Sequence, residues 1–456
     1  MEKKKLGGRI LFNIILFGFI GQVAWAVENV YFNTFLFNYI GGTADDIAKM
    51  VAASAIAAVV TTFIMGTLSD KLDRRHNFLA THARRKIFIS GGYIIWGFTV
   101  AVFAFISREN IGKLFNISDT SKVVAATVCV VIIMDCVMTF FGSTSNDAAF
   151  NAWVTDVTVP ENRGTAEAVL ALLPVFATVI VTVAFGVGVE AAGYPACFMF
   201  LGALVTICGI IGLFSVKDPR KGVKQSTNYF SDLIYGFRPS VIKNNAALYL
   251  CLASACIFNT AVQVFMPYIF IYVQHYLKFD LNTFQITTPI IIGGAAAVVG
   301  LVVVTILLGK LLDKVGKRIF VFPAVLLFVA GLVAVFFAKT LLTFVLFALI
   351  MILGYGLLMI ILNATVRDYT PEDKVGQFQG VRLLFTVTLP MIIGPKVGSW
   401  TISEFSGRYE LGTMLNEYGE STLVPIPTIF LVSAIIAVLI IVPLIFLAKV
   451  TKEKKA

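Results

Sequence analysis

Charged residues are scarce in this chain of 456 residues. Asp, Glu, Lys and Arg make up 14% of it, whereas a soluble domain has about a quarter. Hydrophobic residues account for 58%, and the mean hydropathy is +0.89. This balance excludes an ordinary soluble protein and indicates an integral membrane protein. The net charge of +10 does not predict a nucleic-acid partner, because the basic residues alternate with apolar spans.

The chain also has few of the residues and patterns that build catalytic or metal sites. Its six cysteines lie inside apolar runs without a Cys-x-x-Cys pair, and we interpret them as small buried hydrophobic residues. The three histidines lie in loops or at span ends, which argues against a histidine proton relay. There is no Gly-x-x-x-x-Gly-Lys-[Ser/Thr] loop to support direct use of ATP. No spacing predicts a metal site, a cofactor site or a catalytic triad, so we expect a protein that is not an enzyme.

Windows of about 20 apolar residues mark helices that can cross a bilayer. They predict an all-α membrane protein with twelve spans. The spans run roughly over residues 10–38, 47–69, 87–107, 123–153, 164–188, 194–216, 245–275, 284–308, 319–338, 341–364, 376–404 and 425–448. A polar stretch in the middle predicts three parts: a six-helix bundle at 1–216, a cytoplasmic linker at 217–244 and a second six-helix bundle at 245–456.

Lysine and arginine are distributed unequally between the two sides of these spans. If both termini are cytoplasmic, the cytoplasmic segments carry 27 of the 36 basic residues, the opposite side carries 7 and the eleventh span carries 2. An excess of basic residues marks cytoplasmic loops, so we predict both termini in the cytoplasm. The lysine-rich start and the absence of a long loop favour the cytoplasmic membrane of a bacterium.

Two motifs occur once in each half of the chain. Asn151–Gly164 (NAWVTDVTVPENRG) is echoed by Asn363–Gly376 (NATVRDYTPEDKVG), and Gly66–Arg75 shares the pattern Gly-x-x-x-Asp-Lys-x-[Asp/Gly]-[Arg/Lys]-Arg with Gly309–Arg318. A repeat at this distance indicates two related halves. The second motif follows spans two and eight, and with it the chain resembles the major facilitator superfamily. The resemblance implies two pseudo-symmetric six-helix bundles that work by alternating access.

The resemblance also implies that the repeated loops act as gates. An Asp at the end of one helix can sit at the positive N-terminus of a neighbouring helix, with a basic residue nearby. By the superfamily's symmetry, Asp70 would meet the start of span eleven and Asp313 the start of span five. The predicted gating residues are Asp70, Arg74, Arg75, Asp156, Arg163, Asp313, Lys317, Arg318 and Asp368.

The fourth span resembles one particular family within this superfamily. Residues Asn146–Trp153, with Thr155–Asp156 and Glu161–Arg163 after them, are similar to the fourth-span signature of the glycoside–pentoside–hexuronide:cation symporters, the family of melibiose permease. This likeness implies a sugar or glycoside carried together with a cation. That family places two acids on span two, where this chain has Ala58 and Thr62. Because these two acids are missing from span two, the sequence argues against a sodium site like the one in that family.

Ionisable groups inside a span cost about 2.5–3.5 kcal/mol at the helix centre and usually face the protein interior. Span four carries Asp135, which begins a polar stripe at helical spacing, and Asp147, which lies deeper toward the cytoplasm on the same helix. We predict that these two acids couple transport to a cation. The alternative for both is a structural ion pair. Without paired acids on span two, one protonatable carboxylate is the simplest coupling device, so a proton is favoured over sodium.

Other polar and aromatic side chains could line a cavity near the bilayer midplane. The predicted substrate contacts are Gln22, Trp25, Glu28, Asn29, Asn146 and Phe150. The alternatives are hydrogen bonding between helices for the amides and core packing for the aromatic rings. Arg382 and Lys396 are further charges in span eleven, and Lys396 could pair with Glu28 or reach the headgroups.

These patterns predict a monomeric secondary transporter in the lipid bilayer that imports a sugar or glycoside with a cation. The alternative is an exporter or a carrier of another small solute, such as a drug or nucleoside, which a wide apolar cavity would favour. A receptor, scramblase or scaffold would not need the repeated Asp-Arg loops.

Overall fold

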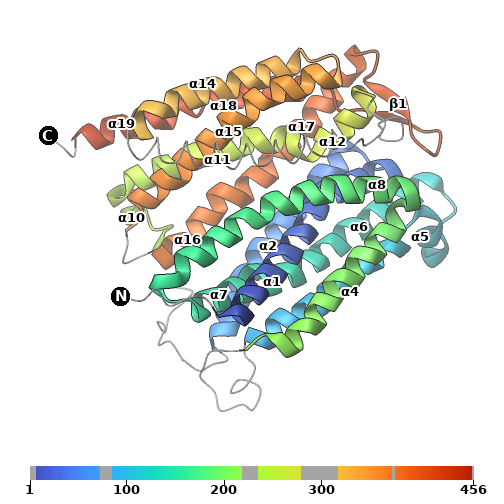
Figure 1. Cartoon of the computed structure of the whole chain (residues 1–456). Coiled ribbons are helices and arrows are strands. Elements are labelled where there is room, and N and C mark those ends of the chain that lie inside the picture. The colour runs from blue at the N-terminus through green and yellow to red at the C-terminus, as the bar shows by residue number, and fades with distance from the viewer. Residues whose placement is uncertain (1–6, 72–84, 218–234, 279–316, 372–374, 454–456) are drawn as a thin grey trace. The chain divides into compact units, whose positions relative to one another are not determined.

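The computed structural model describes residues 7–71, 85–217, 235–278, 317–371 and 375–453. These residues are almost wholly helical (Figure 1). The chain divides into two compact units, and the division does not follow the sequence strictly. One unit comprises Met1–Gly42 and Ala53–Gln225, and the other comprises Thr43–Ala52 and Ser226–Ala456.

Long helical runs interrupted by π-helical turns make up the N-terminal unit. In chain order they are α1 (Gly8–Val27), η1 (Glu28–Phe32), η2 (Phe35–Tyr39), α2 (Ala44–Lys71), η4 (Ile87–Gly91), α4 (Gly92–Val102), η5 (Phe103–Phe105), α5 (Arg108–Phe115), α6 (Thr120–Gly142), η6 (Ser143–Phe150), α7 (Asn151–Val157) and α8 (Pro160–Ser215). The first turns of α2 are grouped with the C-terminal unit.

The C-terminal unit adds a small β-hairpin to its helices. Its elements are α10 (Pro239–Asn244), α11 (Ala246–Phe265), η7 (Met266–Tyr268), α12 (Ile269–Ile271), η8 (Tyr272–Tyr276), α14 (Lys317–Phe336), α15 (Leu341–Tyr369), α16 (Val375–Leu383), η10 (Leu384–Thr388), α17 (Leu389–Phe405), η11 (Ser406–Arg408), β1 (Thr413–Leu415), β2 (Ser421–Leu423), α18 (Thr428–Val438) and α19 (Ile441–Glu453). The strands pair antiparallel, with Met414 opposite Thr422. The hairpin lies between the predicted spans at 376–404 and 425–448, where no strand was predicted.

Ten helical runs among the described residues are long and apolar enough to cross a membrane. Each overlaps a predicted span, and the run Val169–Ser215 overlaps two of them. These two meet at Gly193, whose φ of 78° breaks the helix inside α8. Only glycine adopts such a backbone conformation readily. The predicted span at 284–308 lies outside the described residues.

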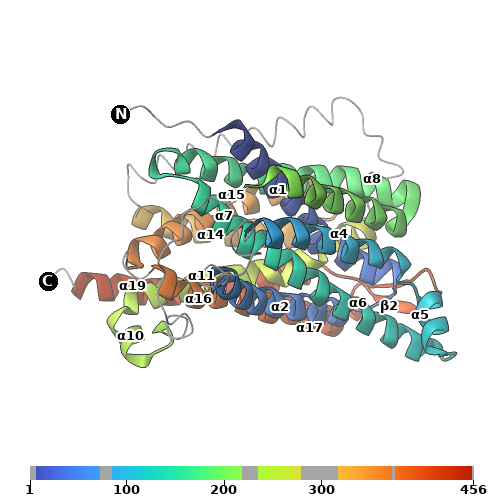
Figure 2. The same cartoon turned by 90° about the horizontal axis from the view of Figure 1, so that it is seen from below.

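Glycines allow neighbouring helices within each unit to approach closely. A Cβ atom on Gly97 of α4 would lie 2.5 Å from the carbonyl oxygen of Gly202 in α8, and a Cβ on Gly202 would lie 2.5 Å from the carbonyl oxygen of Gly97. Figure 2 shows these two helices side by side. In the other unit, Gly354 of α15 packs in the same way on the backbone of Phe328 in α14. Small residues at such contacts are typical of packed membrane helices.

Candidate functional site

A cluster of two carboxyl and two hydroxyl side chains lies inside the N-terminal unit. The Ser54 hydroxyl on α2 lies 2.8 Å from Glu28 Oε1, and the Thr139 hydroxyl on α6 lies 3.2 Å from the same oxygen. The two hydroxyls are 2.8 Å apart. Asp135 precedes Thr139 by one helical turn, is 1% exposed, and interacts with both Glu28 and Ser54. We call these four residues the carboxylate cluster.

The carboxylate cluster is not electrically balanced by the side chains around it. Among the described residues, Glu28 Oε2 and Asp135 Oδ1 are buried without a hydrogen-bond partner, and neither carboxylate forms an ion pair. A buried carboxylate that lacks a partner costs several kcal/mol. The cluster can therefore hold a proton or another monovalent cation. No group of three His, Cys, Asp or Glu side chains that could hold a metal ion occurs in the described ranges.

Two tryptophans pack against the end of α6. The rings of Trp25 and Trp96 have centroids 5.0 Å apart. A Cβ on Gly142 would lie 2.8 Å from atoms of both rings, so glycine allows the rings to rest directly on α6. Trp96 Nε1 and the hydroxyl of Ser143 are also buried without a partner among the described residues. Within the described part of the chain, polar atoms without a partner are thus found at Asp135 on α6, at Ser143 where η6 begins, and at Trp96 on the neighbouring helix α4.

Three of the intramembrane charges predicted from the sequence lie in or beside π-helical turns. Glu28 begins η1, Asp147 lies inside η6, and Arg382 precedes η10 by two residues. Turns of this kind are frequent at functional sites because they displace side chains from the regular helical register. Asp147 itself is half-buried, and the amide of Asn151 donates to its backbone carbonyl at 3.1 Å. Its predicted coupling role stays a prediction.

The predicted substrate contacts have two kinds of surroundings. On span one, Gln22 and Trp25 are half-buried, and Asn29 is exposed with its amide donating to the Trp25 carbonyl oxygen at 2.7 Å. Asn146 and Phe150 are instead buried inside the unit. This location favours the helix-packing alternative for those two residues, and their binding role stays a prediction.

One predicted gating residue forms an ion pair that the sequence did not indicate. Arg85 Nε lies 3.1 Å from Asp156 Oδ2, and the Arg85 side chain is 6% exposed. Asp368 is exposed at the end of α15. The remaining predicted gating side chains lie outside the part described: Asp70, Arg74, Arg75, Arg163, Asp313, Lys317 and Arg318.

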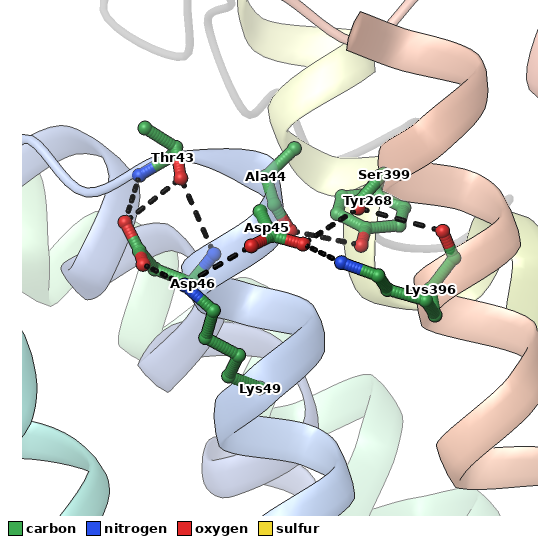
Figure 3. Close-up of polar contacts among 8 residues, drawn as sticks. All are labelled: Thr43, Ala44, Asp45, Asp46, Lys49, Tyr268, Lys396 and Ser399. Atoms are coloured by element: carbon green, nitrogen blue, oxygen red, sulfur yellow. Dashed lines mark hydrogen bonds and ion pairs between the residues drawn. The ribbon is translucent and has the colours of Figure 1, made fainter.

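Lys396 pairs with Asp45, at the first turn of α2 (Figure 3). It does not pair with Glu28, which belongs to the carboxylate cluster. Asp45 also receives the Lys49 ammonium at 3.0 Å and the Ser399 hydroxyl at 3.3 Å. Asp45 was not among the residues predicted from the sequence. An acid in the first turn of a helix is common, and nothing in the linear pattern showed its partner on span eleven.

Comparison with known proteins identifies the family. A family model described as Major Facilitator Superfamily matches residues 14–395 and 294–456, so the chain belongs to that superfamily. It is therefore a multi-pass secondary transporter and not an enzyme. No curated protein matches the chain.

Solved structures of other transporters share the fold. The chain is similar to the nucleoside transporter NupG, with a TM-score of 0.65 at 14% identity over 96% of this chain and 98% of that one. A mutant of NupG gives 0.67 at 13% identity over the same shares. A bacterial homolog of the human lysosomal transporter Spinster, in an inward-facing and unoccupied conformation, gives 0.60 at 14% identity over 97% and 96%. The finer likeness to the melibiose permease family stays a prediction.

Proposed function

We propose that this transporter moves a small polar solute together with a cation, and that the carboxylate cluster binds the cation. The observation that carries the proposal is the pair of carboxyl groups of Glu28 and Asp135. Asp135 is buried and Glu28 is half-buried, each has a buried oxygen without a partner, and no basic side chain is paired to them in the described ranges. Binding of a cation would remove the cost of this buried negative charge. A site whose charge is balanced only when the cation is bound is suited to coupling cation movement to solute transport.

A proton is the cation that the cluster fits best. The hydroxyls of Ser54 and Thr139 can donate hydrogen bonds to an ionised Glu28, as their positions indicate. A hydroxyl can also accept a hydrogen bond from a protonated carboxyl group. The same side chains therefore suit both the loaded and the empty state without rearrangement. Sodium is the alternative cation.

The solute that we propose is a sugar or glycoside. The fourth-span resemblance supports it, and Trp25 offers a half-buried ring one turn before Glu28 on which a sugar could stack. Gln22 and Asn29 lie on the same span and supply amides that suit hydroxyl groups. A nucleoside is the second candidate, because the similar structures include a nucleoside transporter and the ribose ring presents comparable hydroxyl groups.

Transport in reconstituted vesicles tests the proposal. A panel of labelled sugars and nucleosides would be offered to vesicles with an imposed proton or sodium gradient. We expect the proton gradient to drive accumulation by the wild type. Asp135→Asn and Glu28→Gln should lose gradient-driven accumulation but still equilibrate the solute downhill. The matched control is Glu109→Gln, at a carboxylate that is 74% exposed on α5.

Two results would contradict this proposal. If neither gradient moves any sugar or nucleoside, the solute class is wrong. If both cluster variants accumulate solute as the wild type does, the coupling cation binds elsewhere, and Asp147→Asn becomes the next variant to measure.

A further inference from the structure

One apolar cluster joins four helices of the C-terminal unit. Its buried members come from α10, α11, α15 and α16, and they are Val241, Leu248, Cys251, Leu252, Val366, Phe378 and Val381. Val366 and Val381 are each followed by an arginine, Arg367 on α15 and Arg382 on α16. The two arginines thus stand beside the same apolar cluster on consecutive helices, and we call them the arginine pair.

The charges of the arginine pair are not balanced by neighbouring side chains. The two guanidinium groups are close enough to repel each other. Neither forms an ion pair or donates a hydrogen bond to any group in the part of the chain that the structure describes. The carboxylate next to Arg367 in the sequence, Asp368, interacts with Cys251 on α11, and consecutive residues of a helix do not face each other. The pair therefore leaves two positive charges at one place in the unit.

The position of Arg382 makes its charge costly. Arg367 is exposed in the last turn of α15, where a cation is favoured by the helix dipole. Arg382 is instead half-buried and follows the start of α16 by seven residues, which is about 10 Å along a helix. It lies inside the run Gly380–Arg408, which is apolar enough to cross a membrane. A cation inside a span is costly, and a second cation nearby raises the cost, so an anion bound between the two would be stabilising.

The chemistry of two guanidinium groups selects the kind of anion. Each is planar and presents its N–H groups as a fork that matches the two oxygens of a carboxylate or phosphate group. Chloride offers no such pair of oxygens. The π-helical turn η10 begins two residues after Arg382, and the Thr386 hydroxyl within it donates to the Arg382 carbonyl oxygen at 2.9 Å. Turns of this kind are frequent at functional sites.

We propose that the arginine pair is an oxyanion-binding site, in which Arg367 and Arg382 together hold one carboxylate or phosphate group. Such a group belongs either to a soluble anion or to the headgroup of a phospholipid, and both present the same oxygens to the two guanidinium groups. The site lies in the C-terminal unit, whereas Glu28 and Asp135 belong to the N-terminal unit. The proposal needs neither the coupling cation nor the solute class assigned above.

Chemical modification of arginine by phenylglyoxal tests the site. The delipidated full-length protein would be held in an uncharged maltoside detergent, which contains no phosphate, and the modification rate of each arginine would be read by mass spectrometry of its peptides. One arm adds inorganic phosphate at an ionic strength kept constant with sodium chloride, and the other adds phosphatidylglycerol to the micelles. We expect modification of both Arg367 and Arg382 to slow as 1/(1 + [L]/Kd), which is roughly tenfold when the anion is at about ten times its Kd. Arg408, exposed on η11 of the same unit, should react at an unchanged rate.

The two arms distinguish the sources of the anion, and two variants test the pairing. Protection by phosphate identifies a site that is open to soluble anions, and protection by phosphatidylglycerol alone identifies a lipid site. Arg367→Gln should abolish the protection of Arg382, whereas the matched control Lys243→Gln, at an exposed cation on α10, should keep it. The proposal is overturned if neither anion protects Arg382, if Arg408 is protected equally, or if Arg382 stays protected in Arg367→Gln. Failure of the transport assay would leave this result unaffected.

Discussion

The side-chain amide of Asn146 donates a hydrogen bond to the Tyr93 hydroxyl at 2.6 Å, and that hydroxyl donates to the Phe17 carbonyl oxygen, also at 2.6 Å. The relay joins η6, α4 and α1 in the interior of the N-terminal unit. Gly21 gives it room, because a Cβ there would lie 2.1 Å from the Asn146 amide nitrogen. The first and fourth spans, which carry Glu28 and Asp135, are thus joined by a buried polar contact.

Loss of the Tyr93 hydroxyl should destabilise this unit. Tyr93→Phe removes the acceptor for the Asn146 amide and leaves that buried donor without its short hydrogen bond. The expected loss in the free energy of unfolding is about 1–3 kcal/mol, seen as a lower midpoint of thermal unfolding. Tyr355→Phe is the matched control, because the Tyr355 ring packs on Phe258 and its hydroxyl makes no hydrogen bond within the described ranges. Equal midpoints for both variants would show that the relay does not stabilise the unit.

Gly398 should not tolerate a larger side chain. In Gly398→Ala the new Cβ would lie 2.2 Å from the Val264 carbonyl oxygen and 2.6 Å from the Tyr268 ring, so α11 and α17 would have to separate. Overpacking of this kind costs about 1–3 kcal/mol. Gly356→Ala is the control in α15, where a Cβ meets nothing within 4 Å and alanine is the better helix former. Thermal unfolding in detergent should separate the two, and an unchanged midpoint for Gly398→Ala would contradict the close packing.

Loss of the buried arginine near α7 should destabilise the protein more than loss of an exposed ion pair. Arg85→Gln removes the cation beside Asp156, whose side chain is 18% exposed. We expect a loss of about 2 kcal/mol, since one partner of a largely buried pair is left behind. Lys113→Gln breaks the fully exposed pair with Glu109 and should produce no measurable change. A chemical unfolding series measures both, and similar midpoints would contradict a stabilising role for the Arg85 contact.

The spans were predictable because their signal is compositional. About twenty apolar residues are needed to cross a bilayer whatever the helix contacts, so the span expected at 87–107 corresponds to the run Ile87–Phe105. The break at Gly193 fell where the windows separated, between two predicted spans. The π-helical turns and the hairpin at β1 and β2 were not predicted. Both depend on which backbone groups pair, and hydropathy does not encode that pairing.

Single residues of the candidate site could be predicted from the sequence, but the contacts between them could not. Asp135 stands out in the sequence because an acid inside a span is costly, and Glu28 stands out for the same reason. Their predicted roles were separate, because the link between them passes through Ser54, which lies on a different span from either acid. Serine is common in membrane helices, so its sequence position carries no signal. Asp45 was missed for a related reason, since its partner Lys396 lies 351 residues away.

The carboxylate cluster should behave as one unit in transport, and this is the sharpest test of its composition. If Glu28 and Asp135 hold one cation together, either Glu28→Gln or Asp135→Asn alone should abolish gradient-driven accumulation, and the double variant should be no worse. Residues that act as a unit show such strong non-additivity. The measurement is the ratio of internal to external labelled solute under a fixed proton gradient, with Glu109→Gln as the control. Two partial losses that add in the double variant would mean that the carboxylates act independently, and the hydroxyls of Ser54 and Thr139 would then serve Glu28 alone.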